Sequence, residues 1–188
     1  MPKASKSRVP PPMNRFDPEE DAQRFTDNHV VPDEETGPQA IYLVRIFYPH
    51  NKTFHWALGW NAYKRNKEDV LEHCGWHMVD FQKETDAKDS PLAFRHQYKA
   101  IDCVTSHFWE LTELQDGISV NNRIVLLGWC EAWDPRVGGN CITCVCSVID
   151  DLQGLGVLHA AAITTLRQAR DRDMEDVAKG RYHIEAAV

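Results

Sequence analysis

A cysteine directly follows a helix-capping residue late in the chain, in the segment Gly138-Gly139-Asn140-Cys141. Asparagine is a preferred N-cap residue, and apolar residues recur at helical spacing after it, so Cys141 is expected in the first turn of a helix over residues 141–155. A helix N-terminus stabilises a thiolate through its dipole and its free N–H groups. We interpret Cys141 as a candidate nucleophile. A buried core cysteine is the alternative interpretation, and the commoner one for a cysteine taken alone.

The residues before the cysteine are candidates for substrate binding. The glycines would let a substrate carbonyl reach the thiol and nearby backbone donors, and the Cys141 N–H is one expected oxyanion donor. Gly139 and Asn140 are therefore predicted substrate-binding residues. Six tryptophans could line a hydrophobic substrate groove, and Trp56 is the candidate among them, although burial in the sheet is the alternative for it.

A base must come from elsewhere in the chain, and His55 is the best candidate. Residues 53–60 predict a strand in which Phe54, Trp56, Leu58 and Trp60 share one face. His55 lies on the other face with Ala57 and Gly59, which leaves that face open for a helix to approach. A core or edge-strand histidine is the alternative.

The third residue of a catalytic set would orient the base. His77 lies in the next predicted strand, and Asp80 lies three residues further on, so the two side chains point to opposite faces of that strand. We expect His77 to orient His55 and retain Asp80 as the alternative.

The elements that must position these residues predict an α+β fold with an antiparallel sheet of about four to six strands and packed helices. Residues 1–38 are expected to form a disordered Pro-rich tail and residues 39–188 a single α+β domain. Strands are predicted over 40–48, 53–60, 76–81 and 93–104, and helices over 141–155 and 157–177. Residues 123–133 could be a strand or a buried helix, and residues 106–116 could begin as a short helix.

Three motifs together carry a family resemblance: the histidine strand FHWALGW, a second strand with a polar residue, and the helix start GGNCITCVCSVIDDLQGLG. They resemble the circularly permuted papain-like proteins, which include permuted NlpC-type peptidases, lecithin retinol acyltransferase-like enzymes and PPPDE-type isopeptidases. The chain looks especially similar to a largely fungal set of small proteins. The resemblance implies a permuted papain-like fold and a cysteine-dependent hydrolase, amidase or acyltransferase. It implies Cys141 as nucleophile, His55 as base and His77 as third residue.

Rival interpretations remain for the same residues. Cys141, Cys144 and Cys146 form C-x-x-C-x-C, which could hold structural zinc or act as a redox pair, but a zinc site needs further ligands from elsewhere. A non-catalytic papain-like module that binds a peptide or small metabolite is the main alternative to an enzyme. No phosphate-binding motif is present, and no cofactor or metal is predicted.

Composition limits the remaining possibilities. The chain has 188 residues and a net charge of −7, which argues against general binding to nucleic acid or anionic membranes. The polar, Pro-rich start does not resemble a signal peptide, and no segment has the length of apolar sequence that spans a membrane. A cytoplasmic protein acting on a small-molecule or peptide substrate is therefore expected, and its oligomeric state is left open.

Overall fold

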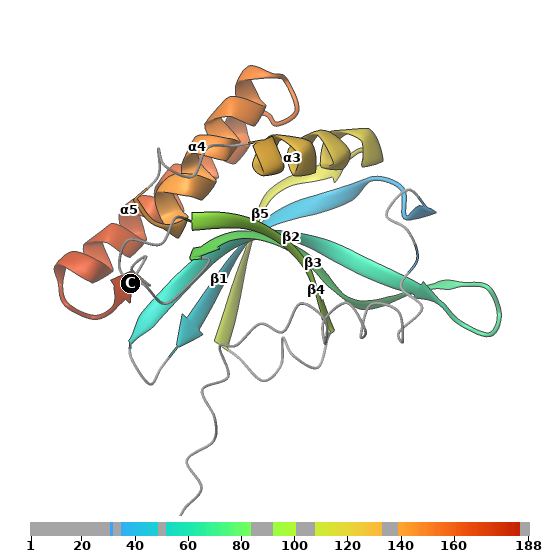
Figure 1. Ribbon diagram of the computed structural model, residues 1–188, viewed down its shortest axis with the longest axis horizontal. Coiled ribbons are helices and arrows are strands. Elements are labelled where there is room, and N and C mark those ends of the chain that lie inside the picture. The colour runs from blue at the N-terminus through green and yellow to red at the C-terminus, as the bar shows by residue number, and fades with distance from the viewer. Residues whose placement is uncertain are drawn as a thin grey trace, which may run out of the picture.

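Nine helices and strands are defined in the computed structural model, which describes residues 31, 35–48, 52–83, 92–100, 108–132 and 139–184. The strands are β1 (Gln39–Tyr48), β2 (Thr53–Arg65), β3 (Leu71–Lys83), β4 (Leu92–Ala100), β5 (Phe108–Ile118) and β6 (His183–Ile184). The helices are α3 (Val120–Ala132), α4 (Cys141–Gly154) and α5 (Ala160–Ala178). Figure 1 shows the three helices on one side of a curved sheet.

The sheet has the strand order β4-β3-β2-β1-β5. Neighbouring strands on this path are antiparallel, and the short β6 pairs with β2 in parallel. This antiparallel sheet with helices packed against it confirms the expected α+β class.

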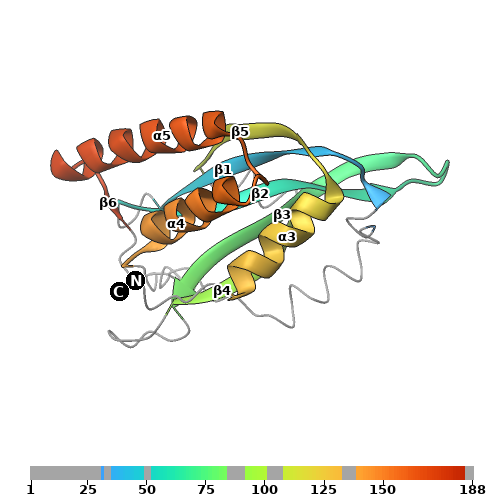
Figure 2. The same ribbon diagram turned by 90° about the horizontal axis from the view of Figure 1, so that it is seen from above.

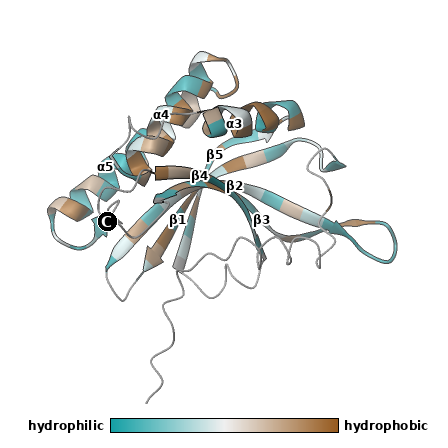
Figure 3. Ribbon diagram, viewed as in Figure 1, coloured by the Kyte–Doolittle hydropathy of each residue, from teal (hydrophilic) through white to brown (hydrophobic). Residues whose placement is uncertain are grey.

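The helices cover the face of β2 that carries its large apolar side chains (Figure 2). Phe54, Trp56, Leu58 and Trp60 are fully buried there with the inward side chains of α4 and α5. Removing these aromatic and aliphatic side chains from water is the main favourable contribution to folding. Figure 3 shows hydrophobic and hydrophilic residues interspersed along the strands and helices.

The expectation that a helix packs on the His55 face of β2 is wrong. That face carries a second, smaller cluster that joins Ala57 to residues of β1 and β3. Close packing around Gly59 leaves no room for a side chain, because a Cβ atom there would lie 2.9 Å from Cγ2 of Val44. The helices lie on the opposite face because the large apolar area is there.

Two ambiguous segments are resolved by the tertiary structure. Residues 123–133 lie mostly in helix α3, which packs against α4 and β4. Residues 108–116, where a short helix was possible, belong to strand β5 at the sheet edge beside β1. The predicted fourth strand is found as β4, while residues 101–104 of that prediction lie outside the described residues.

Part of the predicted N-terminal tail contacts the domain. The guanidinium of Arg123 is buried in α3 and donates to the hydroxyl of Thr36 at 3.0 Å and to the carbonyl of Gly37 at 2.9 Å. Val31 is buried, and its N–H donates to the carbonyl of Tyr63 at 2.8 Å. The rest of the predicted tail lies outside the described residues.

Helix α5 is attached to the sheet through a buried carboxylate. Asp173 is fully buried; one of its oxygens accepts the indole N–H of Trp56 at 2.8 Å, and the other lies 2.8 Å from the guanidinium of Arg45. The Arg45 guanidinium also packs over the ring of Phe47, at 4.3 Å from its centroid. These contacts hold the first half of β2, together with β1, against α5. Across the ranges described, no helix is long and apolar enough to cross a bilayer.

Candidate functional site

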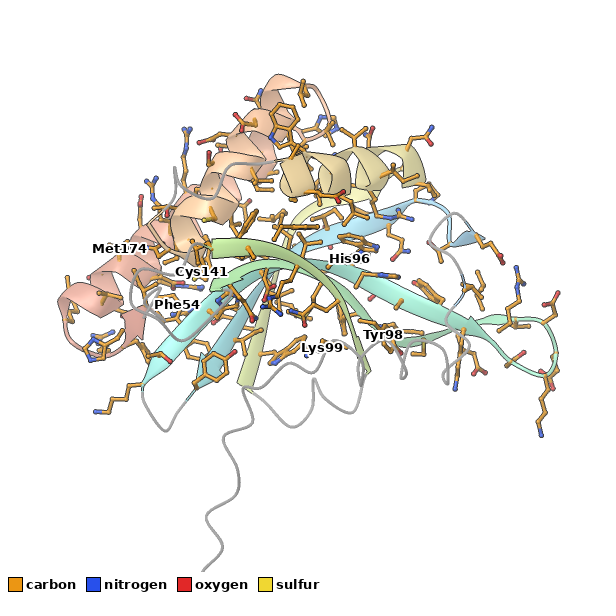
Figure 4. The ribbon with its side chains drawn as sticks, in the orientation of Figure 1. Phe54, His96, Tyr98, Lys99, Cys141 and Met174 are labelled. Carbon is orange, nitrogen blue, oxygen red and sulfur yellow. The ribbon has the colours of Figure 1, made fainter. Side chains whose placement is uncertain are left out.

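Cys141 is the first residue of α4, as the capping pattern predicted. The Asn140 side chain accepts from the N–H of Thr143 at 3.0 Å, and the Thr143 hydroxyl accepts from the N–H of Asn140 at 3.0 Å. This reciprocal capping box fixes the first helical turn. Figure 4 shows Cys141 at the end of α4 that meets the sheet.

The thiol occupies a break in the hydrogen-bond ladder along one edge of β2. The ladder with β3 begins at the pair Ala57 and Asp80, and the ladder with β6 covers Thr53 and Phe54. Between them, the backbone N–H of Trp56 donates to Cys141 Sγ at 3.4 Å. Because the start of α4 fills this break, the thiol reaches His55 although α4 packs on one face of the sheet and the His55 side chain lies on the other.

His55 lies between a thiol and a carboxylate. Its Nε2 is 3.0 Å from Oδ2 of Asp80, and its side chain is also hydrogen-bonded to Cys141. Since Nε2 faces Asp80, Nδ1 is the ring nitrogen left for the thiol. His55 and Cys141 are each 3% exposed and Asp80 is 1% exposed, so the three polar groups interact away from bulk water.

These neighbours change the protonation of His55. Burial alone lowers the pKa of the imidazole, but the negative charge of Cys141 and the hydrogen bonds to Asp80 and Cys141 raise it well above the usual 6.5. An opposite charge and hydrogen bonds to the charged form both favour imidazolium. The arrangement therefore favours the protonated form of His55, which lies between the Cys141 thiol and the Asp80 side chain.

Two glutamine side chains hold the carboxylate. The amide of Gln82 donates to Oδ2 of Asp80 at 2.7 Å, and the amide of Gln97 on β4 donates to Oδ1 at 3.2 Å. Amide donors stabilise an ionised carboxylate and restrict its rotation. With both oxygens held in this way, Oδ2 is directed at the His55 ring.

The structure gives the position beside His55 to Asp80, and the preference for His77 is corrected. Asp80 pairs with Ala57 on β2, so it shares the His55 face of the sheet. His77 pairs with Trp60 on the opposite face, where its ring stacks on Trp60 and its Nδ1 lies 3.3 Å from Nε2 of His96. The two side chains point to opposite faces, as expected, and the register decides which of them meets His55.

The predicted substrate-binding residues have different positions. Gly139 is exposed and Asn140 is partly exposed, so the start of α4 reaches the surface. The side chain of Trp56 is fully buried and does not line a groove. It is the backbone N–H of Trp56, not its indole, that contacts the thiol.

The first turn of α4 includes backbone N–H groups that make no hydrogen bond within the helix. The first four N–H groups of a helix lack partners within the helix. Thr143 N–H is satisfied by the Asn140 side chain and Asn140 N–H by the Thr143 hydroxyl, whereas within the described ranges the N–H groups of Cys141 and Ile142 have no such partner. Such donors beside a nucleophile can stabilise an oxyanion.

The other cysteines that the structure describes are free thiols: Cys74, Cys130, Cys144 and Cys146. Burial raises the pKa of Cys130 to about 12, that of Cys144 to about 12 and that of Cys146 to about 11. In the described part of the chain, no three His, Cys, Asp or Glu residues are arranged to hold a metal ion.

Sequence reasoning missed Gln82 and Gln97. Gln82 is two residues after Asp80 on the same strand, so strand alternation alone places both on one face. That signal was available for Gln82. Gln97 belongs to β4, and only the pairing of Gln97 with Met78 brings it to this face beside Asp80.

Comparisons of the chain with family models, curated proteins and solved structures found no significant match.

Proposed function

We propose that the protein is a cysteine-dependent acyl-transfer enzyme, a thiol hydrolase, amidase or acyltransferase. The observation that carries the proposal is the placement of His55 between the Cys141 thiol and the Asp80 carboxylate. Nucleophile, base and orienting group within hydrogen-bond reach are what cysteine catalysis requires. The permuted papain-like resemblance, with histidine before cysteine in the chain, is consistent with this reading.

In the proposed first step, the Cys141 thiolate attacks the carbonyl carbon of the substrate. A C–S bond forms, and the carbonyl π electrons move to oxygen, where the N–H groups of Cys141 and Ile142 donate to the oxyanion. The oxyanion electrons then re-form the C=O bond as the C–N or C–O bond breaks, and the His55 imidazolium gives its proton to the leaving group. Asp80 accepts from Nε2 throughout and keeps Nδ1 directed at the sulfur.

In the second step, neutral His55 removes a proton from the acceptor as that acceptor attacks the acyl-enzyme. Water as acceptor gives a carboxylic acid, and an alcohol or amine gives a new ester or amide. The oxyanion returns its electrons, the C–S bond breaks and the thiolate is regenerated with imidazolium beside it. The substrate class is a carbonyl compound, a small molecule or peptide, small enough to enter at the exposed start of α4.

The test is acylation by a small activated ester, p-nitrophenyl acetate. The wild-type protein should release a stoichiometric burst of p-nitrophenol and gain the mass of one acetyl group on Cys141. Cys141→Ala should lose both signals. Cys146→Ala is the matched control, because it removes a partly buried thiol from the same helix and should retain both signals.

Labelling with iodoacetamide at about pH 6, where ordinary thiols are almost fully protonated, tests the same activation without a substrate. Cys141 should react faster than a free thiol, and His55→Asn should abolish the difference. If Cys141 reacts no faster than a free thiol and forms no acetyl adduct, the catalytic proposal fails and a non-catalytic binding module is favoured.

A further inference from the structure

Cys144 is a buried thiol that the proposed chemistry does not use. It lies one turn after Cys141 on the side of α4 that faces the sheet, and it is fully buried. Both cysteines belong to the same apolar cluster. The C-x-x-C spacing therefore places a second thiol beside the candidate nucleophile.

The two cysteines are within disulfide range by helix geometry. Cα atoms three residues apart in an α-helix are separated by about 5 Å, inside the range of roughly 4.4–6.8 Å that disulfides span. The negative charge of Cys141 also contributes to the raised pKa of Cys144, as expected for neighbouring sulfurs. The capping box at Asn140 does not involve either thiol, since it uses only backbone groups and the side chains of Asn140 and Thr143.

Cys146 does not have this relationship to Cys141. The two residues are five positions apart in the helix, which separates their Cα atoms by about 9 Å, beyond the limit of about 7 Å for a disulfide without backbone movement. Cys144 and Cys146 are two residues apart, so their side chains point to different sides of the helix. Of these two cysteines of α4, Cys144 is therefore the one that can form a disulfide with Cys141.

We propose that Cys141 and Cys144 form a reversible disulfide under peroxide, so that the first turn of α4 is an oxidative modification site that switches the nucleophile off and protects it. The inference rests on the proposed function, because it uses the ionised Cys141 thiol as the group that peroxide attacks.

The chemistry balances in two steps. The Cys141 thiolate attacks one oxygen of hydrogen peroxide; an S–O bond forms, the O–O bond breaks, and hydroxide leaves. Cys144 sulfur then attacks Sγ of the sulfenic acid; the S–S bond forms, the S–O bond breaks, and the departing hydroxide takes the Cys144 proton as water. Peroxide is reduced by two electrons, and each sulfur loses one.

Oxidation itself prepares the second step. Burial raises the pKa of Cys144 to about 12, and the charge of Cys141 adds to the rise. A sulfenic acid in place of the thiolate removes that charge, so Cys144 becomes easier to ionise once Cys141 has been oxidised.

The experiment treats the reduced full-length protein with a small excess of hydrogen peroxide, alkylates it under denaturing conditions and maps the tryptic peptide over residues 137–167. The wild-type peptide should lose the mass of two hydrogens, with only Cys146 alkylated, and dithiothreitol should restore nearly all of the Cys141 thiol. Cys144→Ser should form no such disulfide, and most of its Cys141 should be lost to sulfinic acid, which dithiothreitol does not reduce. Cys146→Ser, the matched control, should behave as the wild type.

Two outcomes separate this inference from the proposed function. If Cys141 forms the acetyl adduct but peroxide gives no 141–144 disulfide, or the thiol of Cys144→Ser recovers as well as that of the wild type, the redox inference is wrong and the catalytic one stands. If Cys141 is unreactive toward the ester and iodoacetamide, the proposed function fails. Diamide oxidises dithiols directly, so it then still tests whether Cys141 and Cys144 are placed to form a disulfide. If diamide gives no disulfide between them, the redox inference is wrong.

Discussion

At the scale of single residues, the identity of the group behind His55 is the main finding. A carboxylate at 3.0 Å from Nε2 both orients the ring and stabilises its protonated form. A histidine in that place, as the sequence led us to expect, would orient the ring without supplying a negative charge. The site therefore resembles a Cys–His–Asp arrangement in its geometry.

Asp80→Asn should slow iodoacetamide labelling of Cys141 at about pH 6 by roughly 10- to 150-fold, the factor that corresponds to losing a charged hydrogen bond of about 1.5–3 kcal/mol. His77→Asn should change the labelling rate by less than about threefold, or under about 1 kcal/mol, because the His77 side chain lies on the face of β3 opposite to His55. Equal effects of the two variants would show that Asp80 has no special role. Circular dichroism of both variants checks that they are folded.

The raised pKa of His55 predicts a pH dependence of stability. Because the folded-state pKa lies above the unfolded value of 6.5, the protonated ring contributes stability that is complete below 6.5 and is lost as the pH rises through the folded-state pKa. The difference in unfolding free energy between the wild type and His55→Asn should therefore shrink as the pH rises above 6.5 and through the folded-state pKa. Urea unfolding at several pH values measures it, and a constant difference would contradict the ionised pair.

At the scale of elements, the start of α4 has two structural roles. It caps the helix through Asn140 and Thr143, and it places Cys141 in the gap between the β6 and β3 ladders on β2. The capping residues are exposed or partly exposed, whereas the thiol one residue later is buried. The first turn of α4 thus connects the surface of the molecule to the buried side chains of Cys141 and His55.

Loss of the cap should affect stability and reactivity together. Asn140→Ala should reduce the free energy of unfolding by about 0.5–2 kcal/mol, as for other N-cap removals, and should slow labelling of Cys141 because the first turn loosens. Chemical denaturation and iodoacetamide kinetics measure the two effects.

Ser119→Ala is the matched control for the cap. Ser119 accepts the N–H of Asn122 at 3.2 Å at the start of α3, so its loss removes a comparable cap from a helix start without the candidate nucleophile. This variant should lose similar stability and label at the wild-type rate. If Ser119→Ala also slows labelling of Cys141, the slower labelling in Asn140→Ala is a result of general destabilisation.

At the scale of the whole molecule, α5 and the sheet are joined by the buried group of Asp173, Arg45 and Trp56. Trp56 connects this group to the site, because its indole meets Asp173 while its backbone N–H meets Cys141. The position of the thiol thus depends on Asp173, more than thirty residues further along the chain, since this residue of α5 helps to fix the strand that contacts the thiol.

Asp173→Ala should destabilise the protein by about 3–5 kcal/mol, because it removes the buried carboxylate from the buried Arg45 guanidinium and leaves it the partly exposed carboxylate of Glu110. Asp171→Ala removes an exposed carboxylate paired with Arg170 and should cost less than about 1 kcal/mol. Thermal or urea unfolding of the two variants distinguishes them. A small effect of Asp173→Ala would mean that α5 docks through its apolar face alone.

Much of the site could be predicted from local sequence. Asn140 before an apolar, helically spaced run predicts a capped helix that begins at Cys141, and the alternation from Thr53 to Trp60 predicts the strand that presents His55. Both are local properties, since capping and alternation depend on residues a few positions apart. The aromatic face of β2 was also evident, although the side on which the helices pack was predicted incorrectly.

Only the tertiary structure decided which side chain stands behind His55 and how the thiol reaches it. Alternation shows that His77 and Asp80 point to opposite faces, but the choice depends on the pairing of Ala57 with Asp80, and a shift of one residue would exchange the two. Register is a non-local property, set by turns and by packing of both faces. For the same reason, neither the break in the β2 ladder that admits Cys141 nor the approach of Gln97 from β4 could be read from the sequence alone.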